Sequence, residues 1–199
     1  MKCMNFSTLA GVFIAGSAIF SVATSATAEN VPKVRFATTA GEFLVEVYPD
    51  KAPKTVENFL QYVKDKHYDG TVFHRVIENF MVQGGGFDAN YVQKKTRAPV
   101  AHEGREALAK GGPKNVPGTL AMARTNDPNS ATAQFFINVK DNSFLDPSAQ
   151  QPGYTVFGKV VGGMDVVQKI KAAPTGPGGP FPSDVPKTPI LINSATLVN

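Results

Sequence analysis

The most unusual segment of the sequence is Phe73-His74-Arg75-Val76-Ile77-Glu78-Asn79-Phe80-Met81-Val82-Gln83-Gly84-Gly85. β-Branched and aromatic residues dominate from Thr71 to Ile77 and again from Phe80 to Gln83, and the glycine run that follows breaks the pattern. Residues of these types are enriched in strands, and glycine clusters mark turns. The stretch therefore predicts two consecutive β-strands.

Polar side chains interrupt the apolar pattern of these two strands. Because successive side chains of a strand point to opposite faces, strand periodicity puts Arg75 on a face with Phe73 and Ile77. For the same reason Met81 shares a face with Gln83. A guanidinium beside Met and Phe side chains is either stacked as a structural strut or presented to a ligand, and the spacing alone favours neither role.

Outward from this stretch, strand patterns alternate with turn residues. Further strands are expected at residues 34–38, 43–47, 119–124, 133–139, 154–161 and 190–198. Together with the first two, these segments make about eight short strands. The segment 87–118 has few periodic apolar positions and is expected to be a surface loop with short pairings, and a Pro/Gly-rich run at 174–189 leads into the last strand.

Two segments have the periodicity of helices. Val56, Phe59, Leu60 and Val63 fall at i, i+3, i+4 and i+7, which is one stripe of a helix entered through a proline in its first turn. Residues 165–172 predict a short second helix, capped by the aspartate at its start, Asp165. The fold expected from periodicity is therefore mainly β, a sandwich or closed barrel with helices covering its open ends.

Composition and charge limit the classes of function. The 199 residues include 18 Gly and 15 Pro, which indicates many turns, and 42% are hydrophobic, which is enough for one packed core. The formal net charge of +4 is too small on this length to indicate a nucleic-acid binder, so no nucleic-acid partner is expected.

The first residues differ from the rest. Lys2 is followed by an apolar run at 9–22 and by Ala26-Thr27-Ala28, the small-x-small pattern cut by signal peptidase. Residues 1–28 are therefore expected to be a secretory signal peptide and 29–199 a single mature domain. The apolar run is shorter than the roughly 20 residues that span a bilayer, so no stable membrane association is expected after cleavage. The single cysteine, Cys3, would be removed, which excludes thiol chemistry.

Familiar catalytic motifs are missing from the sequence. None of His67, His74 and His102 is spaced with a Glu or a second His as in a zinc-binding helix, so no metal site is expected. No G-x-S-x-G elbow occurs after residue 28, and the glycine clusters lack the Lys-Ser/Thr of a phosphate-binding loop. No cofactor is expected.

Several blocks in order, together with the opening stretch, resemble the cyclophilin family of peptidyl-prolyl cis-trans isomerases. They are Met122-Ala123-Arg124, Ala133-Gln134-Phe135-Phe136-Ile137-Asn138, Asn142-Ser143-Phe144-Leu145-Asp146, Val156-Phe157-Gly158-Lys159-Val160 and Gly163-Met164-Asp165-Val166-Val167. Their order and spacing follow the family along nearly all of 34–198, and the likeness is strongest to exported bacterial members. This resemblance implies a closed eight-stranded antiparallel β-barrel capped by two α-helices, with a peptide groove on its outer surface.

The resemblance also implies the activity and its residues. Arg75 would be the catalytic arginine and Gln83 an orienting hydrogen-bond partner. The proline ring would be received by four side chains, Phe80, Met81, Phe136 and Leu145. Ala123 and Arg124 would present backbone groups to the peptide, with Gln134 nearby. His74 follows the family motif, and a structural role in the barrel wall is favoured over proton transfer.

Two further substrate-contacting positions depart from the drug-sensitive eukaryotic members. Phe144 stands where those members carry Trp, and Tyr154 where many carry His; Arg124 also replaces a common Asn. Because none of these side chains is the catalytic donor, we expect isomerase activity with weaker binding of the drug cyclosporin.

The main interpretation is thus a periplasmic, monomeric isomerase that acts on proline-containing, exported, folding polypeptides. One alternative is a peptide-binding chaperone of the same fold, in which turnover is incidental; a binding groove of that kind would need the apolar pocket but no aimed arginine. A secreted hydrolase has little support, because the sequence has no nucleophile–base pair.

Overall fold

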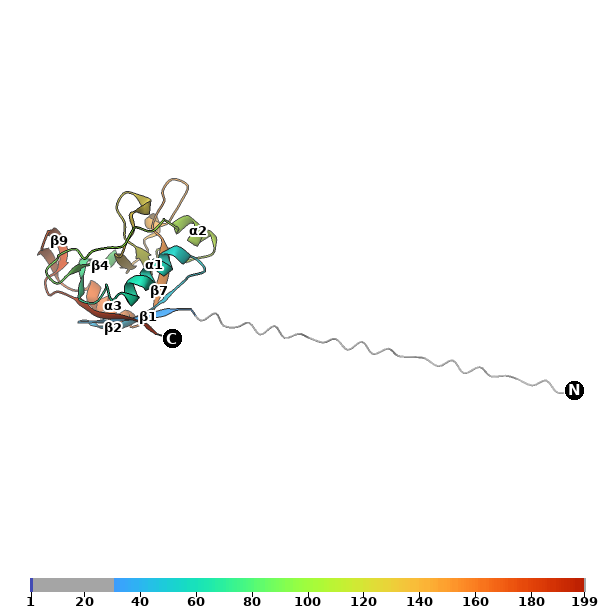
Figure 1. Ribbon diagram of the computed structural model, residues 1–199, viewed down its shortest axis with the longest axis horizontal. Coiled ribbons are helices and arrows are strands. Elements are labelled where there is room, and N and C mark those ends of the chain that lie inside the picture. Colours follow the sequence, from blue (N-terminus) through green and yellow to red (C-terminus); the bar gives the residue numbers. More distant parts are fainter. Residues whose placement is uncertain (2–30, 199) are drawn as a thin grey trace.

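The computed structural model describes residues 1 and 31–198 (Figure 1). The predicted signal peptide therefore lies outside the described residues apart from Met1, and its boundary stays a prediction. Within the described part of the chain, the helices are all too short or too polar to cross a membrane.

Eight antiparallel strands close into a barrel in the order β1-β10-β3-β4-β6-β5-β7-β2. They are β1 Lys33–Thr38, β2 Gly41–Val47, β3 Thr71–Ile77, β4 Met81–Asp88, β5 Thr119–Met122, β6 Phe135–Asn138, β7 Val156–Gly162 and β10 Leu191–Val198. This confirms the closed eight-stranded barrel. Closure leaves no exposed sheet edge on the barrel, so every strand is paired on both sides.

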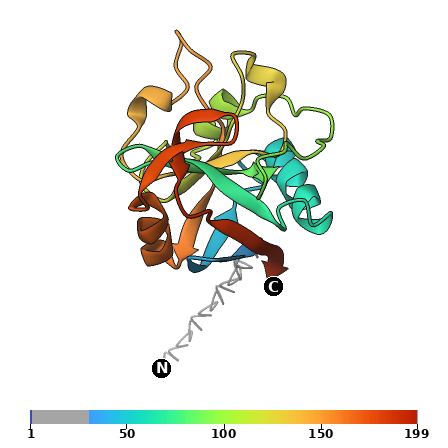
Figure 2. The same cartoon turned by 90° about the vertical axis from the view of Figure 1, so that its left-hand side faces the viewer.

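Aromatic rings fill the interior of the barrel. Phe36 stacks on Phe43 with 4.9 Å between ring centroids, and Phe59 lies 5.0 Å from Phe157. Phe59 belongs to the helix α1 (Pro53–Lys64), whose predicted apolar stripe also buries Val56 and Val63 in the same core. A short helix, α3 (Met164–Lys171), covers the barrel on the opposite side (Figure 2). The two predicted helices are confirmed.

The start of α3 differs from the prediction. Its N-cap residue is Gly163, whose φ of +71° is the left-handed conformation that glycine adopts without strain. Asp165 is therefore not the cap; it lies in the first turn of the helix and forms an exposed ion pair with Lys169 at 3.6 Å.

Two elements occur where the sequence predicts irregular structure. The helix α2 (Gly104–Ala109) lies within the expected surface loop, and the hairpin of β8 (Thr175–Gly178) and β9 (Phe181–Pro186) occupies the Pro/Gly-rich run. Neither segment shows a periodic apolar pattern, because α2 buries only one face of one turn and the hairpin buries little besides Val185.

A buried carboxylate joins α2 to α1. Glu103, only 7% exposed, accepts hydrogen bonds from the backbone N–H groups of Lys54 (3.1 Å) and Thr55 (2.8 Å) and from the Thr55 hydroxyl (2.7 Å). The N-cap residue of α1, Ala52, has no side chain that could serve these donors. Glu103 therefore caps α1 from a distant part of the chain, and its negative charge is favourable beside the positive end of the helix dipole.

We predict that Glu103→Ala lowers the free energy of unfolding by about 2 to 4 kcal/mol, because it leaves buried donors of α1 without a partner. Urea unfolding at pH 7 measures this change. Glu57→Ala is the matched control, since it removes an exposed carboxylate from the same helix; its effect should stay within about 0.5 kcal/mol. Equal effects of the two substitutions would contradict the capping role.

Candidate active site

Strand pairing places polar and apolar side chains in one row across four barrel strands. Arg75 is paired with Gln83, Gln83 with Phe136, and Phe136 with Ala121. The adjoining residues on the other face belong to the barrel core, Val76, Val82, Ile137 and Leu120. The same strands are thus buried inside by the core and carry the row Arg75–Gln83–Phe136–Ala121 on the outer face.

A β-bulge in β3 sets the direction of its side chains. Phe73 is paired with Gly84 and Arg75 with Gln83, so two steps along β3 match one step along β4. A bulge of this kind changes the face to which the following residues point. Phe73 consequently lies in the core, whereas His74 and Arg75 both line an outer pocket. The prediction that Arg75 shares a face with Phe73 is therefore wrong.

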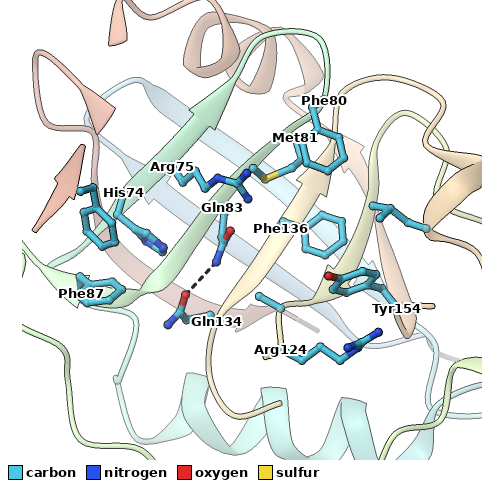
Figure 3. Close-up of a pocket in the computed structure, with 13 residues that line it drawn as sticks. His74, Arg75, Phe80, Met81, Gln83, Phe87, Arg124, Gln134, Phe136 and Tyr154 are labelled. Atoms are coloured by element: carbon cyan, nitrogen blue, oxygen red, sulfur yellow. Dashed lines mark hydrogen bonds between the residues drawn. The ribbon is translucent and has the colours of Figure 1, made fainter. Parts of the chain in front are cut away.

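The outer pocket has a volume of about 370 Å³. All of the predicted site residues except Phe144 line it, and His74, Phe87 and Phe181 line it as well (Figure 3). Its apolar floor is a buried cluster separate from the barrel core, made by Met81, Ala121, Phe136 and Val156. The pocket thus combines an apolar floor with several polar side chains, as ligand sites do.

Arg75 is the exposed cation of this pocket. Its guanidinium carbon lies 6.0 Å from the centroid of the Phe80 ring, and no carboxylate among residues 31–198 forms an ion pair with it. Gln83 donates a hydrogen bond to the side-chain oxygen of Gln134 at 3.0 Å. Gly86 makes room for this pair, because a Cβ there would lie 2.5 Å from the Gln134 side chain. The guanidinium donors of Arg75 are thus free to meet a ligand.

Buried asparagines hold the apolar wall of the pocket. Asn142 donates from its side chain to the carbonyl oxygen of Phe80 (2.8 Å) and to the side-chain oxygen of Asn138 (2.7 Å). Asn138 in turn donates to the hydroxyl of Thr119 (3.0 Å). The backbone N–H of Leu145 donates to the Asn142 carbonyl oxygen (2.8 Å). This network ties Phe80 and Leu145, which come from different parts of the chain, to the end of β6 at Asn138.

Arg124 closes the opposite wall with its side chain as well as its backbone. Its guanidinium lies 4.5 Å from the Tyr154 ring centroid and donates twice to the carbonyl oxygen of Gly153, at 3.1 and 2.8 Å. Tyr154 in turn meets Phe136 edge to face at 5.5 Å. Of the backbone groups expected to face the peptide, the Ala123 N–H is already engaged, because it donates to the Gln134 carbonyl oxygen at 3.0 Å.

Phe144 is the predicted site residue that does not line the pocket. Its side chain is 63% exposed and stacks on Phe80 at 5.7 Å, so it lies behind that ring rather than inside the cavity. Phe87 and Phe181 line the pocket but were not predicted. Phe181 comes from the unpredicted hairpin, and nothing in the local pattern of either residue indicates the contact between them.

His74 is a buried ring in the wall of the pocket. It is 3% exposed and packs 4.7 Å from Phe87, and burial lowers its pKa from the usual 6.5 to about 4. His74 is therefore uncharged at neutral pH, which favours the structural role over proton transfer. Among the described residues, no three His, Cys, Asp or Glu side chains are grouped as metal ligands.

Comparison with known sequences places this site in a family. The family model for cyclophilin type peptidyl-prolyl cis-trans isomerase/CLD matches residues 33–197. Peptidyl-prolyl cis-trans isomerase cyp18 of Streptomyces antibioticus is 52% identical over 83% of this chain and 98% of its own length. Peptidyl-prolyl cis-trans isomerase B of Escherichia coli is 52% identical over 82% of this chain and 98% of its own length.

Solved structures share the barrel. A cyclophilin type peptidyl-prolyl cis-trans isomerase of Cryptosporidium parvum superposes with a TM-score of 0.68 at 23% identity, covering 85% of this chain and 98% of that one. The cyclophilin AquaCyp293 of Hirschia baltica gives a TM-score of 0.65 at 27% identity, covering 82% of this chain and 73% of that one.

The lowered pKa of His74 predicts a pH dependence of stability. In the unfolded chain this histidine takes up a proton near its usual pKa of 6.5, but in the folded protein only near pH 4. Its contribution is therefore complete above pH 6.5 and is lost as the pH falls to about 4, by about 3 kcal/mol. We predict that the free energy of unfolding of His74→Gln, measured with urea at several pH values, falls less steeply across this window than that of the wild type. Parallel curves would contradict the prediction.

Proposed function

Because the chain belongs to the family of cyclophilin-type peptidyl-prolyl cis-trans isomerases, we propose that the pocket beside Arg75 is its active site. Its activity is the cis-trans isomerisation of the bond before proline, and its substrates are proline-containing peptides. The observation that carries the assignment of the site is the row of paired residues that sets Arg75 beside Gln83 and Phe136.

The reaction requires a rotation and no bond cleavage. Conjugation between the amide nitrogen and its carbonyl gives the rotation a barrier of roughly 18 to 20 kcal/mol, so the uncatalysed reaction takes tens to hundreds of seconds. At the top of this barrier the amide is twisted, and its nitrogen lone pair is no longer shared with the carbonyl. The nitrogen has then become a better hydrogen-bond acceptor, which is what an enzyme can stabilise selectively.

Arg75 supplies a donor suited to that nitrogen. A guanidinium stays protonated at any physiological pH and carries several N–H groups in a rigid plane. Arg75 extends from a barrel strand over the apolar wall at Phe80, where water is partly excluded and a hydrogen bond is stronger. Each 1.4 kcal/mol gained only in the twisted state raises the rate about tenfold.

The apolar floor holds the proline ring in place during the rotation. The proline ring rests against Met81 and Phe136 while the preceding carbonyl swings, and the Gln83–Gln134 pair meets the peptide backbone beside them. Tyr154, held by Arg124, limits the pocket on the side away from Arg75. Holding one side of the bond while the other turns converts binding energy into catalysis.

We further propose where and on what the isomerase acts. The family model begins at residue 33, so residues 1–28 fall before the domain, as a removable export signal would. A cyclophilin of Cryptosporidium parvum has been solved in the presence of the dipeptide Ala-Pro, which is consistent with small proline peptides as ligands. We propose exported, folding polypeptides as substrates, the periplasm as the compartment, and a monomer, since the barrel closes within one chain.

We predict that Arg75→Ala lowers kcat/KM for an X-Pro peptide by about 100-fold, the usual cost of removing one aimed donor. The fold should persist, because the Arg75 side chain is exposed. The measurements are a cis-to-trans assay and circular dichroism. Arg35→Ala, which removes an exposed arginine from β1, serves as the control. Full activity of Arg75→Ala would exclude the mechanism, and intact peptide binding without any wild-type turnover would favour the chaperone alternative.

A second prediction concerns export: cleavage follows Ala28, so the mature protein begins at Glu29. Intact mass of the protein purified from the periplasm measures the cleavage site. Ala28→Arg should leave the precursor uncut, because signal peptidase requires a small residue there. Recovery of protein that still carries Met1, or of protein held in the membrane, would contradict the assignment.

A further inference from the structure

The pocket has two apolar ends, and only one of them is explained by a proline ring. Figure 3 shows Phe80, Phe136 and Tyr154 on one side of Arg75 and Gln83, and His74 with Phe87 on the other. The two glutamines and the guanidinium form a polar waist between the two ends. A peptide that places proline on Phe136 and crosses this waist must reach the second end.

The second end is a cluster of rings from distant segments, which we call the hairpin aromatic cluster, His74, Phe87, Tyr91 and Phe181. Phe181 meets Phe87 edge to face at 5.0 Å and lies 5.3 Å from His74 and 6.2 Å from Tyr91. Phe181 is the first residue of β9, and β9 packs against β3. The hairpin therefore brings a phenyl ring over the strand that carries Arg75.

The exposure of these rings separates them from ordinary core. Phe87 and Phe181 are both only half-buried, and neither belongs to the barrel core or to the floor of the pocket. Both nevertheless line the same cavity as Arg75. Covering apolar surface that is open to a cavity is favourable, because it removes that surface from water.

We propose that the hairpin aromatic cluster is a specificity subsite that binds an apolar side chain of the same peptide, on the far side of Arg75 from the proline. This inference rests on the proposed function of the pocket. The occupant is a residue of the substrate because the cluster continues the cavity that receives the proline, with no wall between them.

The spacing of the strands gives the distance of that residue from the proline. Phe136 on β6 and His74, the member of the cluster on β3, are separated by β4, so the two outer strands lie about 10 Å apart at the usual spacing of strands. An extended peptide advances about 3.3 Å per residue. The side chain that reaches the cluster therefore belongs to a residue about three positions from the proline.

The hairpin aromatic cluster itself contains no ionised side chain. Its members are three uncharged rings and His74, which is neutral at pH 7. A lysine in the same place would lose water without gaining a partner. For a glutamate, the neighbouring cation of the pocket is Arg75, which the proposed mechanism already assigns to the substrate amide, so that pairing would compete with catalysis. The subsite should thus favour leucine or phenylalanine over charged residues, by about five- to tenfold in kcat/KM for a half-buried side chain.

The test uses peptides with one proline among glycine and serine residues. One residue, two to four positions from the proline on either side, is changed in turn to Leu, Lys or Glu. We expect the wild-type protein to prefer Leu at one of these positions, as measured by kcat/KM for isomerisation. Phe181→Lys should shift the preference at that position toward Glu, and Phe181→Glu should shift it toward Lys, by about three- to fivefold.

Opposite shifts in the two variants distinguish a subsite from a role in packing alone, because loss of packing would affect all peptides alike. Leu197→Lys and Leu197→Glu introduce the same charges at an exposed position on β10 and should keep the wild-type preference. A wild-type preference below about twofold at every position, or one unchanged in both Phe181 variants, would overturn the subsite. Absence of turnover on every peptide would instead refute the proposed function, and the subsite with it.

Discussion

The register between neighbouring barrel strands is the constraint on which the site depends. Because side chains alternate between two faces, a slip of one residue between β4 and β6 would move Phe136 into the barrel and Ile137 into the pocket. The buried core makes such a slip costly, since Ile137 and its neighbours on the inner face are enclosed by aromatic rings. The packing of the interior therefore fixes the geometry of the outer pocket.

Buried polar groups hold the parts that strand pairing does not reach. Asn142 ties the loop of Phe80 to the end of β6. Glu103, from a distant segment of the chain, accepts hydrogen bonds from the first turn of α1. In each case a side chain satisfies a backbone group that has no partner in its own element. Such contacts specify one arrangement of the loops, because any other arrangement leaves a buried donor or acceptor unpaired.

Sequence patterns predicted most of the barrel and most of the pocket, and the exceptions have local causes. The strands around Arg75 were found because their residue types are typical of strands, but alternation carried across the β3 bulge put Phe73 on the wrong face. The helix α2 is too short to show a period, and the hairpin of β8 and β9 is concealed by prolines and glycines that normally mark loops. The contacts of Phe181 could not be predicted for the same reason, because they depend on that hairpin.

The barrel closes through strands from opposite ends of the domain, since the last strand, β10, lies between β1 and β3. Lys33 pairs with Val198, so the first and the last strand of the chain must meet before the sheet is complete. Contacts this far apart in sequence form slowly. A chain that has emerged only as far as β9 has two open strand edges, one of them on the strand that carries Arg75, and open edges invite pairing with other chains. This isomerase therefore has a late-closing fold, and its open strand edges stay available to other chains until β10 is in place.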